Sequence, residues 1–224
     1  MNKIQMQNTM FETATLRSST YGFLALIYRS ELTETLLRKI RGQSFLSTLS
    51  VLGANLEDDF FKKLEDGVIE DLAVEYTRLF MGPGKHVSPH ESVHHERNDG
   101  DWGRLWGADT VSVKKFIETA GLEYKSGYEG LPDHISVELE FMQEAAKREA
   151  QAWSEDNNND AVYCLKMEKK FIDEHLSKWV PGFCDRIISE ANLSFYREMA
   201  RITRNYIEYD RAELDSYVSE AEKE

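Results

Sequence analysis

Proline is scarce in this chain, and its placement constrains the fold more than any other feature. The four prolines are at positions 83, 89, 132 and 181. Because proline lacks a backbone N–H and disrupts a helix interior, the long stretches without it are free to form long helices. Within these stretches apolar residues recur every three or four positions, and we find no sustained alternation of the kind that marks strands. The pattern predicts an all-α protein.

Five stretches each carry apolar residues that would line one side of a helix. Their members are, in chain order, Ala14, Tyr21, Leu24, Ala25 and Tyr28; Leu72, Tyr76, Leu79 and Phe80; Ile135, Leu139, Met142, Ala146, Ala150 and Trp153; Leu165, Ile172, Leu176 and Trp179; and Phe195, Met199, Ile202 and Tyr206. The length of 224 residues suits one large domain or two small ones. We predict a single-domain helical bundle of about ten helices over residues 1–224.

Three helix boundaries can be predicted from local chemistry. Asp133 follows Pro132 and is a suitable N-cap for the third of these helices, with glutamates nearby to complement the helix dipole. The fourth helix should end before Pro181, because proline interrupts helical hydrogen bonding. The charge-rich tail after Glu208 should be a solvated helix end.

Two segments break the helical spacing, at residues 82–108 and 127–133. Both are rich in glycine, proline, asparagine and aspartate, which favour turns. A long irregular loop such as the one near 82–108 is uncommon inside a compact domain, and such loops tend to carry function or act as hinges. A hinge there would allow a domain-swapped dimer as well as a monomer.

The charge balance narrows the range of partners. Lysine and arginine total 27 against 40 aspartates and glutamates, which gives a net charge of −13. This excess repels phosphate backbones, so we expect no nucleic-acid partner, whereas a basic peptide would be attracted. The same acidic residues would also serve simply to keep helix surfaces solvated.

Cysteine content and hydropathy indicate the compartment. Cys164 and Cys184 are too few for a disulfide framework or a metal quartet, and both stand among apolar residues that favour core packing. The N-terminal residues lack the apolar segment of a secretory signal, and the longest apolar run, residues 21–28, is too short to span a bilayer. We expect a cytoplasmic protein without membrane insertion, cofactor or metal.

Residues 90–94 spell His-Glu-Ser-Val-His, which matches the H-E-x-x-H pattern of zinc hydrolases. That chemistry needs a helix through both histidines, so that one metal binds both and the glutamate activates its water. Here Pro89 precedes the pattern, Asn98 to Asp101 follow it closely, and Val93 is the one aliphatic residue between His90 and Asp101. A zinc hydrolase using His90, Glu91 and His94 is therefore a weak alternative.

Three segments, taken in order, resemble a known family. They are EYTRLFMGPG (residues 75–84), SPHESV (88–93) and LPDHISVELEFM (131–142). Their order and spacing are similar to those of the TorD/DmsD/NarJ family of molybdoenzyme maturation chaperones, and the resemblance covers about residues 10–205. In the second segment this chain departs from the family pattern, because His94 stands where relatives carry tyrosine, and His90 and Glu91 replace the aromatic residue often found between the proline and the serine.

The resemblance implies an all-helical binding protein rather than an enzyme. Its expected partner is the precursor of a molybdopterin-dependent oxidoreductase, recognised through a twin-arginine leader and held until the cofactor is inserted before export. Carboxylates suit the arginines and apolar side chains suit the rest of such a leader. The candidate leader-binding residues are Asp133, His134, Glu138, Glu91, Pro83, Ser92, His94, Trp102 and Phe141.

Other interpretations of these residues stay open at this point. Glu75 and Glu138 could be structural, accepting hydrogen bonds from the loops, and helical spacing alone would place Phe80, Phe141 and Met142 in the core. A helical adaptor that binds only the folded client enzyme, and not its leader, would show the same composition. The sequence does not identify the client.

Overall fold

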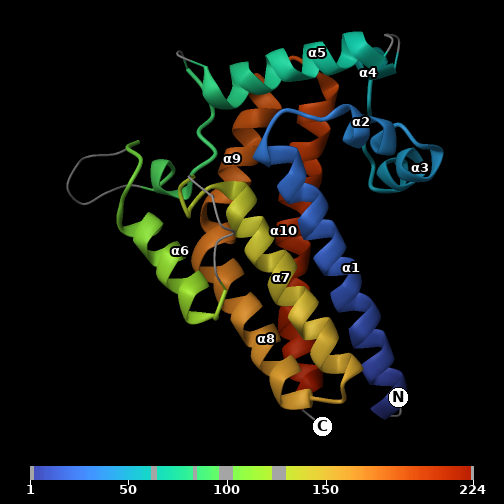
Figure 1. Cartoon of the computed structure of the whole chain (residues 1–224), viewed down its shortest axis with the longest axis vertical. Helices are drawn as coiled ribbons and strands as arrows, with labels where there is room; N and C mark the ends of the chain where they lie inside the picture. The colour runs from blue at the N-terminus through green and yellow to red at the C-terminus, as the bar shows by residue number, and fades with distance from the viewer. Residues whose placement is uncertain (1–2, 62–64, 83–84, 96–102, 123–129, 223–224) are drawn as a thin grey trace. The chain divides into compact units, whose positions relative to one another are not determined.

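The computed structural model of the chain describes residues 3–61, 65–82, 85–95, 103–122 and 130–222 (Figure 1). In these ranges the regular structure is helical, and one isolated antiparallel bridge joins His90 to His134. The prediction of an all-α fold is confirmed. No helix within the same ranges is both long and apolar enough to cross a bilayer.

The helices are α1 (Lys3–Arg29), α2 (Glu34–Ile40), α3 (Gln43–Val51), α4 (Asp58–Phe61), α5 (Glu65–Tyr76), α6 (Ala108–Thr119), α7 (Ile135–Ser154), α8 (Asn158–Phe171), α9 (Ser177–Glu190) and α10 (Ser194–Ala221). Two π-helical segments, Thr77–Met81 and Ile172–Leu176, extend α5 and join α8 to α9, and Glu91–Val93 forms one 3₁₀ turn.

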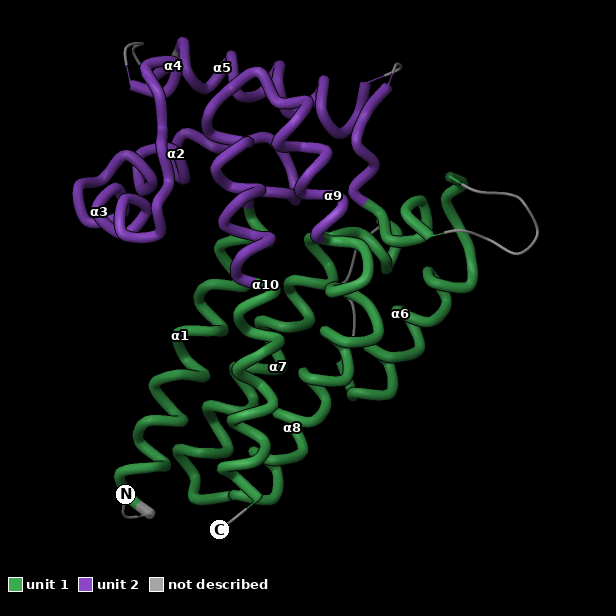
Figure 2. The backbone as a smooth tube through the Cα atoms, turned by 180° about the vertical axis from the view of Figure 1, so that it is seen from behind, with its two compact units in different colours: residues 1–26, 90–180, 207–224 green, residues 27–89, 181–206 purple. Residues whose placement is uncertain are grey.

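The chain divides into two compact units, each assembled from segments that are distant in sequence (Figure 2). Unit 1 comprises Met1–Leu26, His90–Val180 and Ile207–Glu224, and unit 2 comprises Ile27–Pro89 and Pro181–Tyr206. Three of the divisions fall inside α1, α9 and α10, so no linker composition marks them in the sequence. The single-domain assignment stays a prediction.

In unit 1, α7 and α8 form a helical hairpin, and the unit 1 parts of α1 and α10 lie alongside it (Figures 1 and 2). The hairpin turns at Asp156, whose φ of 54° lies in the left-handed region that aspartate tolerates better than most residues. The predicted apolar face of α7 is buried from Ile135 to Trp153. Helical spacing therefore identified the core side of this helix correctly.

The core of unit 1 also holds a buried ionic network. Arg17 donates to Asp210 Oδ1 (2.6 Å), to Glu149 Oε2 (2.8 Å) and to Glu168 Oε2 (2.5 Å). All four side chains are at most 5% exposed. The network joins α1, α7, α8 and α10, and one guanidinium faces three carboxyl groups in a region without solvent.

Unit 2 is built around aromatic side chains. The ring of Phe80 lies 6.2 Å from that of Phe183 and 6.0 Å from that of Tyr196, while Phe60 stacks on Phe195 at 5.6 Å. Such ring pairs add about 0.5–1.5 kcal/mol each beyond their area burial. The core is therefore well suited to fix the ends of α5, α9 and α10 within this unit.

Three sequence predictions about helix ends are wrong. The N-cap of α7 is His134 and not Asp133, because the Asp133 carboxylate accepts the Ser92 backbone N–H and His134 Nδ1 accepts that of Ser136 (3.1 Å). The tail after Glu208 is not simply solvated, since Asp210 is 0% exposed and belongs to the ionic network.

The third wrong boundary concerns Pro181, which lies inside α9 rather than beyond a helix end. An interior proline costs about 3 kcal/mol. However, Val180, Phe183 and Cys184 around it are fully buried, and each large apolar side chain contributes about 1.5–3 kcal/mol on burial. Packing therefore outweighs the hydrogen bond that proline removes.

Candidate functional site

A short turn at residues 90–94 of unit 1 is fixed to the segment that precedes α7. The Glu91 backbone N–H donates to the carbonyl of Asp133 (2.9 Å), and the Ser92 N–H donates to Asp133 Oδ2 (3.0 Å). The bridge between His90 and His134 extends this pairing by one residue. Two of the three resemblance segments, far apart in sequence, therefore meet in space.

His134 has a local structural role in this pairing. Its Nδ1 accepts the Ser136 N–H and lies 2.8 Å from Ser136 Oγ, which caps the first turn of α7. The His90 and His134 rings contact edge to face, with centroids 5.0 Å apart. Both histidines are only partly buried.

Glu138 lies one turn into α7 and is fully buried. Its Oε2 accepts the indole N–H of Trp179 (3.1 Å), and the ring of His94 lies against that indole, 5.1 Å between centroids. Burial raises the pKa of Glu138 well above its usual value, the charge of Glu91 raises it further, and the Trp179 hydrogen bond opposes the shift. The protonated form of Glu138 is therefore favoured.

Glu91 is buried as well, at 1% exposure, and it contacts a buried histidine, His175. Its Oε2 lies 2.9 Å from Nδ1 of His175, which is 2% exposed. The His175 ring packs against Phe171, and Phe171 in turn packs against Phe141 at 4.3 Å. Phe141 thus belongs to the aromatic core of unit 1, as helical spacing alone would suggest.

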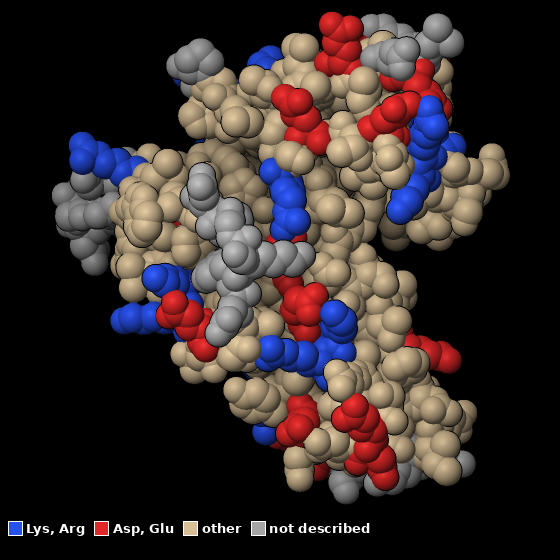
Figure 3. All heavy atoms as spheres, viewed as in Figure 1, with Lys and Arg blue, Asp and Glu red and all other residues tan. Residues whose placement is uncertain are grey.

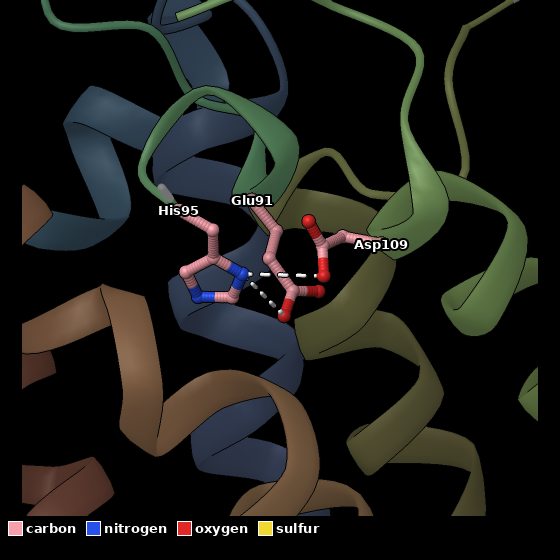
Figure 4. Close-up of side chains that lie close together, drawn as sticks. All are labelled: Glu91, His95 and Asp109. Carbon is pink, nitrogen blue, oxygen red and sulfur yellow. Dashed lines mark ion pairs between the residues drawn. The ribbon is translucent and has the colours of Figure 1, made fainter. Parts of the chain in front are cut away.

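Glu91 also points toward His95 and Asp109 (Figure 4). Nδ1 of His95 lies 3.3 Å from Asp109 Oδ1 and 3.9 Å from Glu91 Oε1, so one imidazole nitrogen faces two carboxylates. Asp109 comes from the first turn of α6, and the other two residues come from the turn at 90–95. The donor atoms of the three residues all lie within 4.8 Å of one another, close enough to hold a metal ion.

Six of the nine predicted site residues are brought together in unit 1, and we call them the paired-turn site. They are Glu91, Ser92, His94, Asp133, His134 and Glu138. Phe141 lies in the aromatic core, and Pro83 and Trp102 lie outside the described residues.

The predicted arginine acceptors of this site are not surface groups. Asp133 and Glu138 are both 0% exposed, and the hydrogen bonds described for them come from the protein itself. The partly exposed members are His94 and His134. The Asp133 carboxylate therefore fixes the two segments to each other, Glu138 joins α7 to Trp179 of α9, and the two histidines are the members that retain some exposure.

Sequence reasoning did not identify Asp109, His175 and Trp179 as parts of this region. Their proximity depends on how the turn at 90–95, α6 and the start of α9 pack within unit 1, which no spacing rule encodes. A weak signal existed, because His175 and Trp179 are four residues apart and would share a helical face.

The geometry also argues against the zinc hydrolase alternative. The helix that H-E-x-x-H requires is replaced by a single 3₁₀ turn at Glu91–Val93. The ring of His90 lies against His134, while that of His94 lies against Trp179. The two histidines therefore have different neighbours and do not converge on one ion.

Charge is mixed on the molecular face shown in Figure 3. Acidic and basic side chains are interspersed there, in both units, rather than gathered into one acidic field. Attraction of a basic peptide to this face would therefore depend on local groups more than on the net charge of −13.

Residues 45–185 match the family model described as the nitrate reductase delta subunit, which is more than half of the chain. The chain belongs to this family. Several curated proteins to which this chain is similar are named Chaperone protein TorD. One, from Shewanella loihica, is 24% identical over 221 residues, which is 94% of this chain and 97% of the relative. Another, from Shewanella pealeana, is 21% identical over 90% of both chains.

A third TorD chaperone, from Vibrio cholerae, is 23% identical over 151 residues; the match spans 67% of this chain and 65% of that protein's length. Among solved structures, one assigned as a redox enzyme maturation protein from Archaeoglobus fulgidus superposes with a TM-score of 0.53 at 22% identity, covering 86% of this chain and 94% of the other. This match supports the helical fold.

The family resemblance read from the three segments is therefore confirmed. The expectation that the family consists of chaperones rather than enzymes is also confirmed, since the curated relatives are named as chaperones.

Proposed function

We propose that this protein is a cytoplasmic maturation chaperone that binds the twin-arginine leader of a molybdopterin-dependent oxidoreductase precursor and holds it until the cofactor is inserted before export. The observation that carries the proposal is the paired-turn site, in which two of the three family segments, residues 88–93 and 131–142, are hydrogen-bonded to each other. Membership of the delta-subunit family supports the chaperone role.

Burial assigns different roles to the residues of this site. Asp133 and Glu138 are inaccessible: Asp133 accepts the Ser92 N–H and so holds the two segments together, and Glu138 accepts the indole N–H of Trp179 and so joins α7 to α9. The rings of His94 and His134 are partly exposed and would meet the leader. A histidine suits that position because it donates and accepts hydrogen bonds and also stacks on apolar groups.

Isothermal titration with a synthetic twin-arginine leader and a lysine–lysine version of it tests the proposal. We expect binding that is weaker for the lysine version, because a guanidinium group stacks on rings such as those of His94 and His134 and is less strongly hydrated than an ammonium group. Absence of binding to either peptide, at low salt and micromolar concentrations, would refute leader recognition. Binding of the folded client enzyme without the leader would support the adaptor alternative instead.

Two variants locate the binding surface. His134→Asn removes the ring yet keeps a good N-cap for α7, and His94→Ala removes the ring that lies on Trp179. We expect both to weaken leader binding while helicity is unchanged. His86→Ala serves as the matched control, because His86 is an exposed histidine of unit 2. If all three variants bound the leader as tightly as the wild type, the binding surface would lie elsewhere.

A further inference from the structure

The cluster of Glu91, His95 and Asp109 carries chemistry that leader binding does not use. An imidazole nitrogen and two carboxylate oxygens form a mixed donor set that suits zinc and other first-row divalent ions better than magnesium or calcium, which prefer oxygen alone. The three donors converge from two separate elements, the turn at 90–95 and the first turn of α6 (Figure 4). We propose that these residues form a binding site for one divalent ion of the zinc type.

The distances fit such an ion with small movements. Tetrahedral zinc with bonds of about 2.0–2.1 Å holds its ligand atoms roughly 3.4 Å apart. His95 Nδ1 and Asp109 Oδ1 are already 3.3 Å apart, and His95 Nδ1 and Glu91 Oε1 are 3.9 Å apart. The three donor atoms all lie within 4.8 Å of one another, so rotation of the Glu91 side chain toward the other two would bring them closer to the spacing that zinc requires.

A second observation comes from the residues behind the ligands. His175 Nδ1 lies 2.9 Å from the other oxygen of Glu91, which leaves Oε1 directed at His95. A buried group that orients a ligand in this way is typical of metal sites, where such partners tune affinity by about 10–100-fold. His175 is itself 2% exposed, and its position is fixed by the rings of Phe171 and Phe116.

The local charge also favours a cation. The ligand Glu91 is 1% exposed, so its carboxylate is largely removed from water. Among the described residues, Glu91 forms ion pairs with His95 and His175, and Asp109 forms one with His95. These histidines are positive only when they are protonated. A divalent ion would offset carboxylate charge that is costly to keep away from water.

The site differs from the zinc pattern spelled by the sequence. That pattern would use His90 and His94, whose rings lie against different partners. The proposed ligands start one residue later, at Glu91 and His95, and are joined by Asp109 from α6. An ion bound there would tie the turn to the first turn of α6 and would stabilise the folded state by restricting the chain between them.

Titration of the tag-free protein with Zn²⁺ tests this proposal, using calorimetry and the thermal midpoint as independent readouts. We expect one ion per chain and a rise in the midpoint. His95→Ala and Asp109→Asn should each weaken binding by about tenfold or more, and His86→Ala should leave it unchanged. Asp109→Asn keeps the side-chain shape at a partly exposed position, so it guards against a variant that merely misfolds.

Several results would overturn the assignment. Stoichiometric binding that persists in both His95→Ala and Asp109→Asn would place the site elsewhere. Several weak zinc-binding events of equal strength in the wild type and the histidine variants would show adventitious binding only. The absence of saturable binding at about 100 μM Zn²⁺, a concentration far above the dissociation constants of typical structural zinc sites, would also refute the site. In the wild type, an NMR spectrum of the imidazole nitrogens should show zinc on Nδ1 of His95; an unchanged His95 ring would refute the site.

Discussion

Replacing Arg17 with methionine should be among the most damaging single substitutions in unit 1. The guanidinium makes four hydrogen bonds of 2.5–3.1 Å to Glu149, Glu168 and Asp210, and these carboxyl groups are at most 2% exposed. Removing one partner of a buried ion pair costs about 3–5 kcal/mol, because the remaining charge stays away from water. Here three carboxyl groups lose one shared partner, so we expect the upper part of that range at pH 8.

The loss should depend on pH, with a sign that follows from proton uptake. Burial already raises the pKa of Glu149 to about 7 and that of Glu168 well above its usual value, while the positive charge of Arg17 lowers both. Without Arg17 the folded protein binds these protons still more tightly than the unfolded chain. The free energy of unfolding of the variant then falls as pH rises. The substitution should therefore destabilise the protein less at pH 5 than at pH 8.

Urea denaturation followed by circular dichroism at the two pH values measures both effects. Arg38→Met is the matched control: Arg38 also pairs with two carboxylates, but its side chain is 62% exposed and its ion pairs are screened by water, so we expect a much smaller loss of stability. If Arg17→Met lost no more than Arg38→Met, or lost the same at both pH values, the buried network would not stabilise the fold as described.

Three further predictions concern single groups. Trp179→Phe removes the N–H that Glu138 accepts and should cost about 1–3 kcal/mol in urea denaturation; a neutral result would mean that the bond is dispensable. Asp59→Ala removes the acceptor of the Ser194 backbone N–H at the start of α10 and should cost about 1 kcal/mol, seen as a lower thermal midpoint; an unchanged midpoint would contradict this capping role. Because the pKa of Glu149 is about 7 in the folded protein, wild-type stability should fall from pH 5 to pH 8 by up to about 3 kcal/mol, and Glu149→Gln should flatten that slope; an equal slope would exclude this residue as the cause.

Helices were the most predictable part of this molecule. The buried side of α7, from Ile135 to Trp153, follows directly from helical spacing, because burial of one face is what stabilises such a helix. Boundaries were less predictable, since they depend on tertiary partners. Asp133 has good capping chemistry but is used by the Ser92 N–H, and Pro181 is retained inside a helix by the burial around it.

The candidate site was predictable only in part. Ordered motifs identified the turn at 90–94 and the segment from Asp133 to Glu138, but not that the buried carboxylate of Asp133 would join them. Asp109 gave no signal, because its contact with His95 depends on how α6 packs within unit 1. The same limit applies to Asp210, which reads as part of a charged tail until Arg17 is seen beside it.

The central claim is that the paired-turn site of unit 1 binds the leader, and hydrogen exchange with mass spectrometry tests it most directly. Saturation with the twin-arginine leader should slow exchange in two peptides, one covering residues 90–95 and one covering 131–138, and the lysine–lysine version should give less protection at equal concentration. Protection confined to other segments, with these two peptides unchanged at saturation, would contradict the account.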